Sequence, residues 1–266
     1  GGIPSRPEGV PHRAGRRKMT EKRHFMIDFH SHVLHNIDDG SHSVEESIEM
    51  MKMSYRQGID TMVFTPHFRL GEHNIRTFLQ ERRDRLDEIR EALTEEDRRE
   101  IPKVILGAEI EYIPGMNHWD YLPELCITGT KYIMTEMPFI PWSEAVVKTI
   151  DDIALNSGLT PVLPHIDRYF HTFTKEEYIR HYYEMPVKIQ MNAIYLNSPK
   201  NIQFYRPLFE EHRIHVLGSD CHSCEWRPPD LGSAVKALVR VCGREALDFI
   251  EKNGREMLAD AVIEEM

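Results

Sequence analysis

The sequence predicts an α/β protein built on parallel strands. From Met26 onward, short apolar runs alternate with longer stretches of helical periodicity, which is the pattern of repeated strand–helix units. Seven such runs, each followed by a helix or a long loop, favour a closed or nearly closed parallel barrel. An open, doubly wound sheet is the alternative, because periodicity alone does not separate the two. No glycine-rich phosphate loop follows any run, so a nucleotide-binding fold has no support.

The expected strands are the apolar runs themselves. They cover residues 26–29, 61–65, 103–108, 132–135, 160–163, 187–191 and 214–217. The first helix is expected to begin after Ser43, a favourable N-cap followed by acidic residues, and to end at Gly58. A second helix, over 74–93, is charged with leucine and isoleucine on one side, as in a helix that packs one face on a core. Further helices are expected over 143–156, 175–183 and 199–212 and in the region after residue 230.

Composition indicates one folded domain preceded by a basic extension. The chain has 266 residues, of which 41% are hydrophobic, enough to bury a sizeable core without disulfides. Residues 1–25 are rich in Arg and Lys and lack apolar periodicity, so we expect a flexible basic extension followed by a single domain over 26–266. The four cysteines are irregularly spaced, which favours a reducing compartment. The sequence contains no run of about 18 apolar residues, so it predicts no membrane-spanning helix. We therefore expect a cytoplasmic protein without stable membrane insertion.

The charge balance argues against nucleic acid as a partner. The chain carries 33 Lys and Arg against 43 Asp and Glu, a formal net charge of −10. A nonspecific nucleic-acid binder normally shows a basic face. An anionic substrate would have to meet a locally positive site made by arginines or metal ions.

The first expected strand carries a pair of candidate metal ligands. It continues as Asp28-Phe29-His30-Ser31-His32, and alternate residues of a strand share a face. His30 and His32 could therefore grip one metal ion, with Asp28 on the same face to orient them from outside.

Metal-capable side chains also follow the other expected strands. They are His67, Glu109, Glu136, His165 with Asp167 and Arg168, and the group Asp220, Cys221 and His222. In a parallel barrel these strand ends meet on one face, where such folds place their active sites. Nitrogen and carboxylate ligands suit Mn²⁺, Fe²⁺ or Zn²⁺ in a hydrolytic site, and more than four ligands imply more than one ion.

A thiol-based mechanism is the competing interpretation of the last strand end. Cys221 and Arg227 have the Cys-x5-Arg spacing of thiol-dependent tyrosine phosphatases, which use covalent catalysis. The segment between them lacks the glycines that expose backbone amides to a phosphate, and the following Pro228 and Pro229 carry no amide hydrogen, so metal chemistry is favoured. Cys221 and Cys224 form a Cys-x2-Cys pair, but no second pair completes a zinc site.

Together the strand ends form a series of short motifs. They are His30-Ser31-His32, Asp38-Asp39-Gly40, Thr65-Pro66-His67, Gly107-Ala108-Glu109, His165-Ile166-Asp167-Arg168 and Ser219-Asp220-Cys221-His222. This series resembles the polymerase-and-histidinol-phosphatase (PHP) family. The resemblance extends from about Met26 to the C-terminal region, and the motifs occur in the same order as in that family. More narrowly, the series resembles the bacterial PHP-type protein tyrosine phosphatases that act on tyrosine kinases of capsule and exopolysaccharide synthesis. The resemblance implies an α/β fold in the form of a distorted (β/α)7 TIM-like barrel.

The resemblance also implies three divalent metal ions, Mn²⁺ by preference with Fe or Zn as alternatives. The implied ligands of the first ion are His30, His32, Glu109 and Asp220. Glu109 would bridge to the second ion, which Glu136 and His165 complete, and the third would take Asp39, His67 and His222. Asp38 could replace Asp39, because adjacent acids cannot be told apart by pattern. In the narrower family two arginines bind the substrate phosphate, and they match Arg168 and Arg227.

The activity implied is hydrolysis of a phosphate monoester by a metal-bound hydroxide. The expected substrate is the phosphotyrosine-bearing tail of a tyrosine kinase that controls capsule or exopolysaccharide synthesis. Arg168, Arg227 and His165 are the expected catalytic residues, and Asp167 is a candidate proton donor. A small-molecule phosphatase such as a histidinol phosphatase is the alternative enzyme, and a noncatalytic metal-binding scaffold of a polysaccharide assembly is the alternative outside enzymes. A homo-oligomer is compatible with the sequence.

Overall fold

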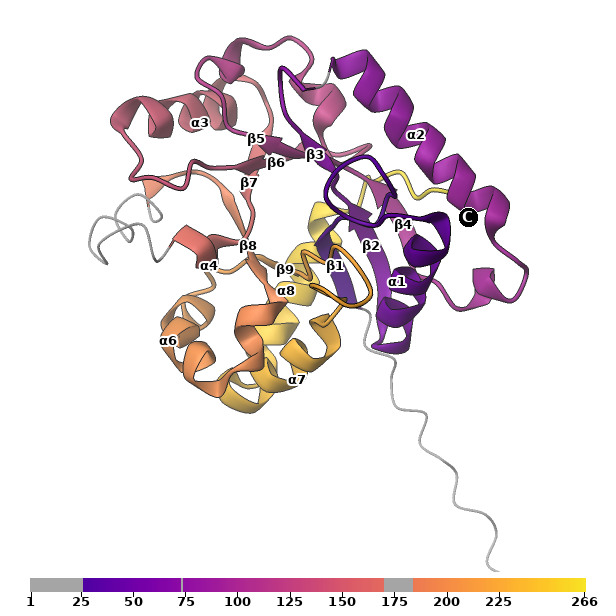
Figure 1. Ribbon diagram of the computed structural model, residues 1–266. Helices are drawn as coiled ribbons and strands as arrows, with labels where there is room; N and C mark the ends of the chain where they lie inside the picture. The colour runs from indigo at the N-terminus through magenta and orange to yellow at the C-terminus, as the bar shows by residue number, and fades with distance from the viewer. Residues whose placement is uncertain (1–25, 73, 170–183) are drawn as a thin grey trace, which may run out of the picture.

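The computed structural model describes residues 26–72, 74–169 and 184–266, in which strands alternate with helices (Figure 1). The strands are β1 (Met26–Ser31), β2 (Ile59–Phe64), β3 (His67–Phe68), β4 (Lys103–Leu106), β5 (Glu109–Glu111), β6 (Tyr132–Glu136), β7 (Thr160–Leu163), β8 (Lys188–Asn192) and β9 (Val216–Gly218). The α-helices are α1 (Val44–Arg56), α2 (Ile75–Ala92), α3 (Glu144–Asn156), α4 (Ile166–Tyr169), α6 (Pro199–Glu210), α7 (Leu231–Cys242) and α8 (Arg244–Met257). Short 3-10 helices are η1 (Asp97–Arg99), η2 (Met116–His118), η3 (Leu122–Leu125) and η4 (Ala193–Asn197).

The strands form a curled parallel sheet in two segments. One has the order β1-β2-β4, the other β3-β5-β6-β7-β8-β9, and neighbouring strands pair in parallel. The segments are continuous along the chain, because β2 leads into β3 and β4 into β5 after short breaks. At these breaks Gly107 N donates to Phe64 O at 2.8 Å and Glu109 N donates to Pro66 O at 3.0 Å. The two pieces therefore act as one curved surface.

The last strand returns to the first beyond its C-terminal end. Ser31 and Cys221 form an isolated parallel bridge. Asp220 N donates to His30 O at 2.8 Å, and His32 N donates to Cys221 O at 2.9 Å. The residues that follow β9 are thus held beside the end of β1.

All seven strands expected from the sequence are present, with bounds that differ by up to two residues. The strand expected over 103–108 ends at Leu106, and a separate strand, β5, begins at Glu109 beside β3. The region after residue 230 forms two helices, because Gly243 lies between them with a φ of +87° that suits glycine. The helix expected over 175–183 lies outside the described residues.

The apolar core lies in two layers, one on each side of the sheet. The inner cluster takes a side chain from each of several strands: Phe29 from β1, Val63 from β2, Ile105 from β4, Met134 from β6, Val162 from β7 and Val216 from β9. The outer, larger cluster lies between the strands and the helices. Alternation along each strand produces this division, since successive side chains point to opposite faces.

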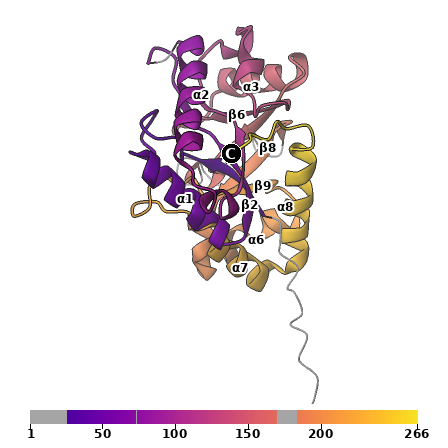
Figure 2. The same ribbon diagram turned by 90° about the vertical axis from the view of Figure 1, so that its right-hand side faces the viewer.

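Helices cover the outer side of the sheet. Figure 1 places α1 and α2 beside β2 and β4, and α6 and α7 on the side of β8 and β9. Figure 2, turned by 90°, shows α8 running along the edge formed by β9, and this helix also packs on β1. No helix among the described residues is both long and apolar enough to cross a membrane.

Candidate metal centre

The end of β1 supplies two imidazoles that face two acids from other strands. His30 Nε2 lies 3.0 Å from His32 Nε2 and 3.1 Å from Glu109 Oε2. His32 Nε2 lies 3.3 Å from Glu109 Oε2 and 3.4 Å from Asp220 Oδ1. All four side chains are essentially buried. Four nitrogen and oxygen atoms from β1, β5 and the loop after β9 thus enclose one small space.

The spacing of these four atoms suits a metal ion. Ligands about 2.1 Å from a tetrahedral ion are separated from one another by about 3.4 Å. The separations that His30 Nε2 and His32 Nε2 make with each other, with Glu109 Oε2 and with Asp220 Oδ1 run from 3.0 to 3.5 Å, the longest being that between His30 Nε2 and Asp220 Oδ1. Two nitrogen and two carboxylate ligands are a set that Mn²⁺, Fe²⁺ or Zn²⁺ accepts. The residues present therefore fit the group that the sequence predicts.

Glu109 lies between this group and a second one. Its Oε2 faces His30 and His32, whereas its Oε1 lies 2.8 Å from His165 Nε2. His165 Nε2 is also 3.2 Å from Glu136 Oε1. Glu109 therefore contacts the His30–His32 pair through one oxygen and His165 through the other, with Glu136 at the end of β6 beside His165.

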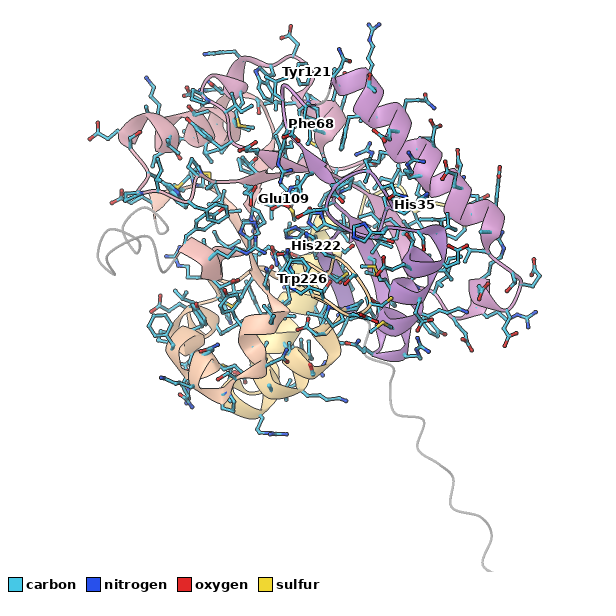
Figure 3. All side chains as sticks on the ribbon, viewed as in Figure 1. His35, Phe68, Glu109, Tyr121, His222 and Trp226 are labelled. Atoms are coloured by element: carbon cyan, nitrogen blue, oxygen red, sulfur yellow. The ribbon has the colours of Figure 1, made fainter. Side chains whose placement is uncertain are left out.

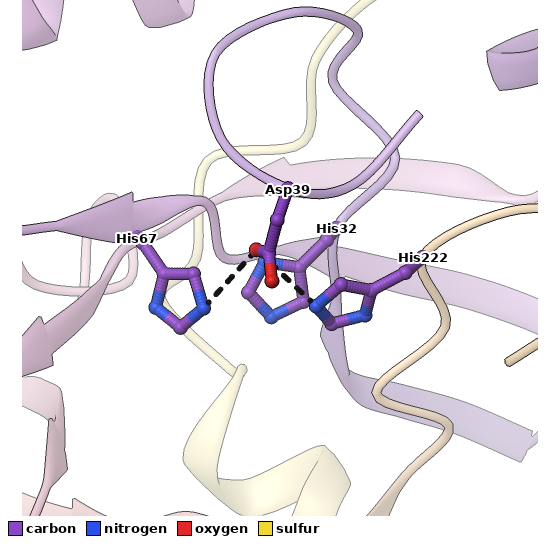
Figure 4. A group of neighbouring side chains, drawn as sticks. All are labelled: His32, Asp39, His67 and His222. Carbon is purple, nitrogen blue, oxygen red and sulfur yellow. Dashed lines mark ion pairs between the residues drawn. The ribbon is translucent and has the colours of Figure 1, made fainter. Parts of the chain in front are cut away.

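A third group contains Asp39, His67 and His222 beside His32 (Figure 4). Asp39 Oδ1 lies 3.5 Å from His67 Nε2 and 3.5 Å from His222 Nε2. The three residues come from the loop after β1, from β3 and from the loop after β9. Asp39 is 58% exposed, so this group is the one nearest to solvent.

The adjacent Asp38 has a different set of contacts. Asp38 Oδ2 lies 2.7 Å from His32 Nδ1 and accepts from His67 N at 2.9 Å, and its Oδ1 accepts from Gly40 N at 2.9 Å. A side-chain Cβ at Gly40 would lie 2.2 Å from His32 O, so only glycine lets the loop fold this closely. Asp38 thus orients the His32 ring and the loop backbone, whereas Asp39 faces the third group.

Asp28, which the sequence places on the same face as the histidines, binds backbone instead. Its Oδ1 accepts from Ser219 N at 2.8 Å and from His30 N at 3.2 Å. The side chain at His30 Nδ1 is Gln190 of β8, at a distance of 3.0 Å. Gln190 could not be predicted from the sequence, because β8 supplies no predicted ligand and its residues have an ordinary strand pattern.

The electrostatics of the centre favour positive charge. Burial would raise the pKa of Glu109, but His30 and His67 outweigh it and hold that pKa well below its usual value. Burial would lower the pKa of His165, but hydrogen bonds with Glu109 and Glu136 raise it to about 9. A divalent ion would supply the positive charge that these acids otherwise draw from the imidazoles.

Two arginines lie beside the ligand groups. Arg168 on α4 and Arg227 in the loop after β9 both pair with Asp220 Oδ2. Arg227 Nη1 also lies 3.1 Å from His222 Nε2. Both guanidinium groups line a cavity of about 170 Å³ together with Tyr195. They form the positive edge of a centre that is otherwise acidic.

Aromatic side chains border the same region. Phe139, which is 49% exposed, stacks on the His165 ring with centroids 5.8 Å apart. Trp226, which is 66% exposed, lies 5.5 Å from the Arg227 guanidinium. Figure 3 shows Trp226 beside the His222 ring, and the two ring centroids are 6.2 Å apart.

The cysteine of the competing mechanism is buried. Cys221 is fully covered, and burial together with the nearby Asp28 raises the pKa of its thiol well above its usual value. A thiol in such a setting is not activated as a nucleophile. Among the described residues, the groups able to hold a metal ion contain no cysteine.

Fold and site together define a class: an α/β protein with a nitrogen–oxygen metal centre at the carboxyl ends of parallel strands. A family model described as capsular polysaccharide synthesis, CpsB/CapC, matches residues 26–259. The chain therefore belongs to the CpsB/CapC family.

Individual relatives cover nearly the whole chain. It is 30% identical over 259 residues to the tyrosine-protein phosphatase CpsB of Streptococcus agalactiae, covering 90% of this chain and 100% of the relative. It is 29% identical over 246 residues to the tyrosine-protein phosphatase YwqE of Bacillus subtilis, covering 90% and 93%. A solved structure described as YwqE from Bacillus subtilis and CpsB from Streptococcus pneumoniae, unique metal-dependent tyrosine phosphatases, matches with a TM-score of 0.76 and 27% identity over 91% of this chain and 97% of that one.

Proposed function

We propose that this protein is a metal-dependent tyrosine-protein phosphatase of capsule or exopolysaccharide synthesis. The observation that carries the proposal is the meeting of histidine and carboxylate side chains able to hold metal ions with two arginines at one end of the sheet. The full-length similarity to named tyrosine-protein phosphatases supports it.

The proposed cofactor is a set of three divalent ions, with Mn²⁺ preferred. His30, His32, Glu109 and Asp220 would hold the first. Glu109, Glu136 and His165 would hold the second, and Asp39, His67 and His222 the third. When bound, such ions act as Lewis acids that neutralise phosphoryl oxygens and lower the pKa of water.

The protein's own side chains would position the phosphate ester. Arg168 and Arg227 now pair with Asp220, and an arriving phosphate dianion would share their guanidinium donors through charge-assisted hydrogen bonds. Phe139 and Trp226 would flank the tyrosine ring. Phenolate leaves more readily than an alkoxide, so the site makes light demands on a proton donor. Asp167 is buried, and its Oδ1 accepts from Asn192 N at 2.9 Å, so we do not assign it the role of proton donor.

The proposed substrate is a phosphotyrosine-bearing segment of a tyrosine kinase, in the cytoplasm where ATP-dependent phosphorylation takes place. We also infer that the curled sheet is a distorted (β/α)7 barrel. The inner cluster shared by β1, β2, β4, β6, β7 and β9 supports this inference, as does the bridge between Ser31 and Cys221.

A substrate panel tests the activity. Purified protein with Mn²⁺ is offered a phosphotyrosine peptide, histidinol phosphate and a short oligonucleotide, and phosphate or nucleotide release is measured. We expect the phosphotyrosine peptide to be hydrolysed with the highest kcat/KM. Turnover of histidinol phosphate alone would indicate a small-molecule phosphatase, and no turnover at all would favour a metal-binding scaffold.

A further inference from the structure

Strand β8 supplies no predicted metal ligand, yet two of its inward side chains contact the predicted ligands His30 and Asp220. Gln190 and Asn192 alternate on one face of β8 and are almost completely buried. Gln190 Oε1 lies 3.0 Å from His30 Nδ1, and Gln190 Nε2 donates to Asn192 Oδ1 at 2.9 Å. Asn192 Nδ2 in turn donates to Asp220 Oδ2 at 2.7 Å. The two amides link His30 to Asp220, and both of these belong to the first ligand group.

The direction of these hydrogen bonds is fixed at both ends. His165 N donates to Gln190 Oε1 at 2.8 Å, and a backbone amide can only donate. At the other end, the ionised carboxylate of Asp220 can only accept. Gln190 Oε1 is therefore an acceptor, so His30 carries its proton on Nδ1. The lone pair of His30 is then on Nε2, the atom that faces the rest of the ligand group.

The polar face of β8 contrasts with the strands beside it. Val162 on β7 and Val216 on β9 turn inward to the apolar cluster, and Val216 is the register partner of Gln190. A buried amide without partners is destabilising, and the Gln190 and Asn192 side chains both have hydrogen-bond partners here. Gly218 makes room for them, since a Cβ there would lie 2.9 Å from Gln190 Nε2 and 2.6 Å from His30 Cβ.

We propose that Gln190 and Asn192 are positioning residues of the metal centre. Gln190 holds His30 in the tautomer whose Nε2 is free to bind, and Asn192 holds the Asp220 carboxylate toward the same ion. Through His165 N, Gln190 also anchors the backbone of a ligand in the second group. This inference rests on the proposed metal centre and names the side chains that preorganise it.

The test measures the tautomer of His30 and the binding of metal, not activity alone. Nitrogen-15 NMR of the imidazoles is recorded on histidine-labelled protein before and after loading with Zn²⁺ as a diamagnetic probe, with His30 assigned from the spectrum of His30→Gln. Titration calorimetry with Zn²⁺ and Mn²⁺ gives the affinities. In the wild type we expect Nδ1 to be protonated in both forms and Nε2 to bind Zn²⁺ in the loaded form. A wild type that binds neither metal would overturn the proposed metal centre itself.

Three substitutions separate the two amides. Gln190→Met removes the acceptor, so we expect the metal-free protein to lose the single His30 tautomer and the metal affinity to fall by about 10- to 100-fold. Gln190→Glu keeps an acceptor for His30 Nδ1 and should restore the tautomer. Asn192→Leu should weaken binding while leaving the His30 tautomer unchanged, because His165 N still anchors Gln190.

Asn253→Leu is the matched control, since Asn253 on the helix α8 donates Nδ2 to His215 O at 2.9 Å, outside the ligand groups. It should lower stability without changing metal affinity or the His30 signals. Wild-type affinity and tautomer in both Gln190→Met and Asn192→Leu would overturn the positioning role. If Gln190→Met does not fold, a changed tautomer in Gln190→Glu or unchanged affinity in Asn192→Leu would overturn it.

Discussion

Chemically identical residues have different roles in this protein because their surroundings differ. Asp38 orients the His32 imidazole and binds the backbone N–H of His67, while the next residue, Asp39, faces a ligand group. Several site residues also have left-handed backbone conformations, with φ of +34° at His165, +51° at Asp220 and +57° at Arg227. Such conformations cost about 1 kcal/mol or more outside glycine and persist where surrounding contacts hold them, commonly at functional sites.

Metal and thiol mechanisms make opposite predictions for two residues. We expect His165→Ala, or removal of metal with a chelator, to abolish hydrolysis of a phosphotyrosine peptide, because His165 lies against Glu109 and Glu136. Cys221→Ser should keep most of the activity, since the thiol is buried. Steady-state kinetics on both variants measure this. A Cys221→Ser enzyme that retains metal but loses turnover would contradict the metal mechanism.

Arg227 should act on the phosphate. Loss of a charge-assisted hydrogen bond costs about 1.5–3 kcal/mol, so we expect Arg227→Ala to lower kcat/KM by about 10- to 100-fold. Arg240→Ala, an exposed arginine on α7, is the control and should leave kcat/KM unchanged. An Arg227→Ala enzyme with wild-type kcat/KM would remove Arg227 from the site.

His215 should make the fold sensitive to acid. Burial, with Lys188 and Arg213 nearby, lowers the pKa of His215 from 6.5 to about 3, and its Nδ1 accepts from Ile189 N at 3.0 Å. Below pH 6.5 the unfolded chain binds a proton that the folded chain does not, so stability falls as the pH drops from about 6.5 toward 3.

His215→Asn offers an oxygen to Ile189 N and does not titrate. Between about pH 7 and pH 5 we expect the wild type to lose about 1–2 kcal/mol more than this variant, measured by urea unfolding. Parallel pH profiles for the two proteins would show that His215 does not titrate differently on folding.

At the scale of the element, the site is built from loops anchored on helices and strands. The helix α1 begins at Ser43, whose hydroxyl accepts from Glu46 N at 3.1 Å. Glu46 then joins two loops, because its carboxylate accepts from His42 N at 2.9 Å and from Cys224 N at 3.1 Å. The first turn of α1 thus ties the loop of Asp39 to the loop of His222.

The cap of α1 should contribute measurably to stability. We expect Ser43→Ala to lower the free energy of unfolding by about 1 kcal/mol and Tm by a few degrees, because one helix N–H loses its acceptor. Ser198→Ala is the matched control, since Ser198 at the start of α6 makes no capping hydrogen bond with its side chain. Equal losses in the two variants, by calorimetry, would show that the cap is not the cause.

At the scale of the whole molecule, the metal centre connects distant parts of the chain. Its proposed ligands come from the ends of β1, β6 and β7, from β3 and β5, and from the loops after β1 and β9. Bound ions would therefore cross-link most of the sheet at its carboxyl end, and the helix α8 packs on β1 and β9 from outside.

Metal should accordingly stabilise the folded protein. At a free Mn²⁺ concentration of about 100 times Kd, one site adds about 2.7 kcal/mol, which is about 5–10 °C in Tm for a domain of this size. Asp220→Asn should reduce this gain, whereas Asp60→Asn, at the start of β2, should keep it. A chelated protein that melts at the same temperature as the Mn²⁺ form would contradict a centre in the folded state.

Much of the fold and of the ligand set can be predicted from the sequence, because both depend on local patterns. Apolar runs mark the strands, and parallel strands bring their carboxyl ends together, so His30, His67, Glu109, Glu136 and His165 could be expected to meet. The breaks after β2 and β4 could not be predicted, because the sequence around Gly107 has the pattern of one continuous strand. Only the pairing of β3 with β5 in the folded sheet shows the break.

The role of each site residue, in contrast, depends on the tertiary structure. The difference between Asp38 and Asp39 comes from which rings each carboxylate can reach, and Asp28 turns out to bind backbone. The contacts of Gln190 and Asn192 with His30 and Asp220 join residues far apart in the chain. Hydrogen bonds of this kind have no sequence period, so only the packed sheet decides them.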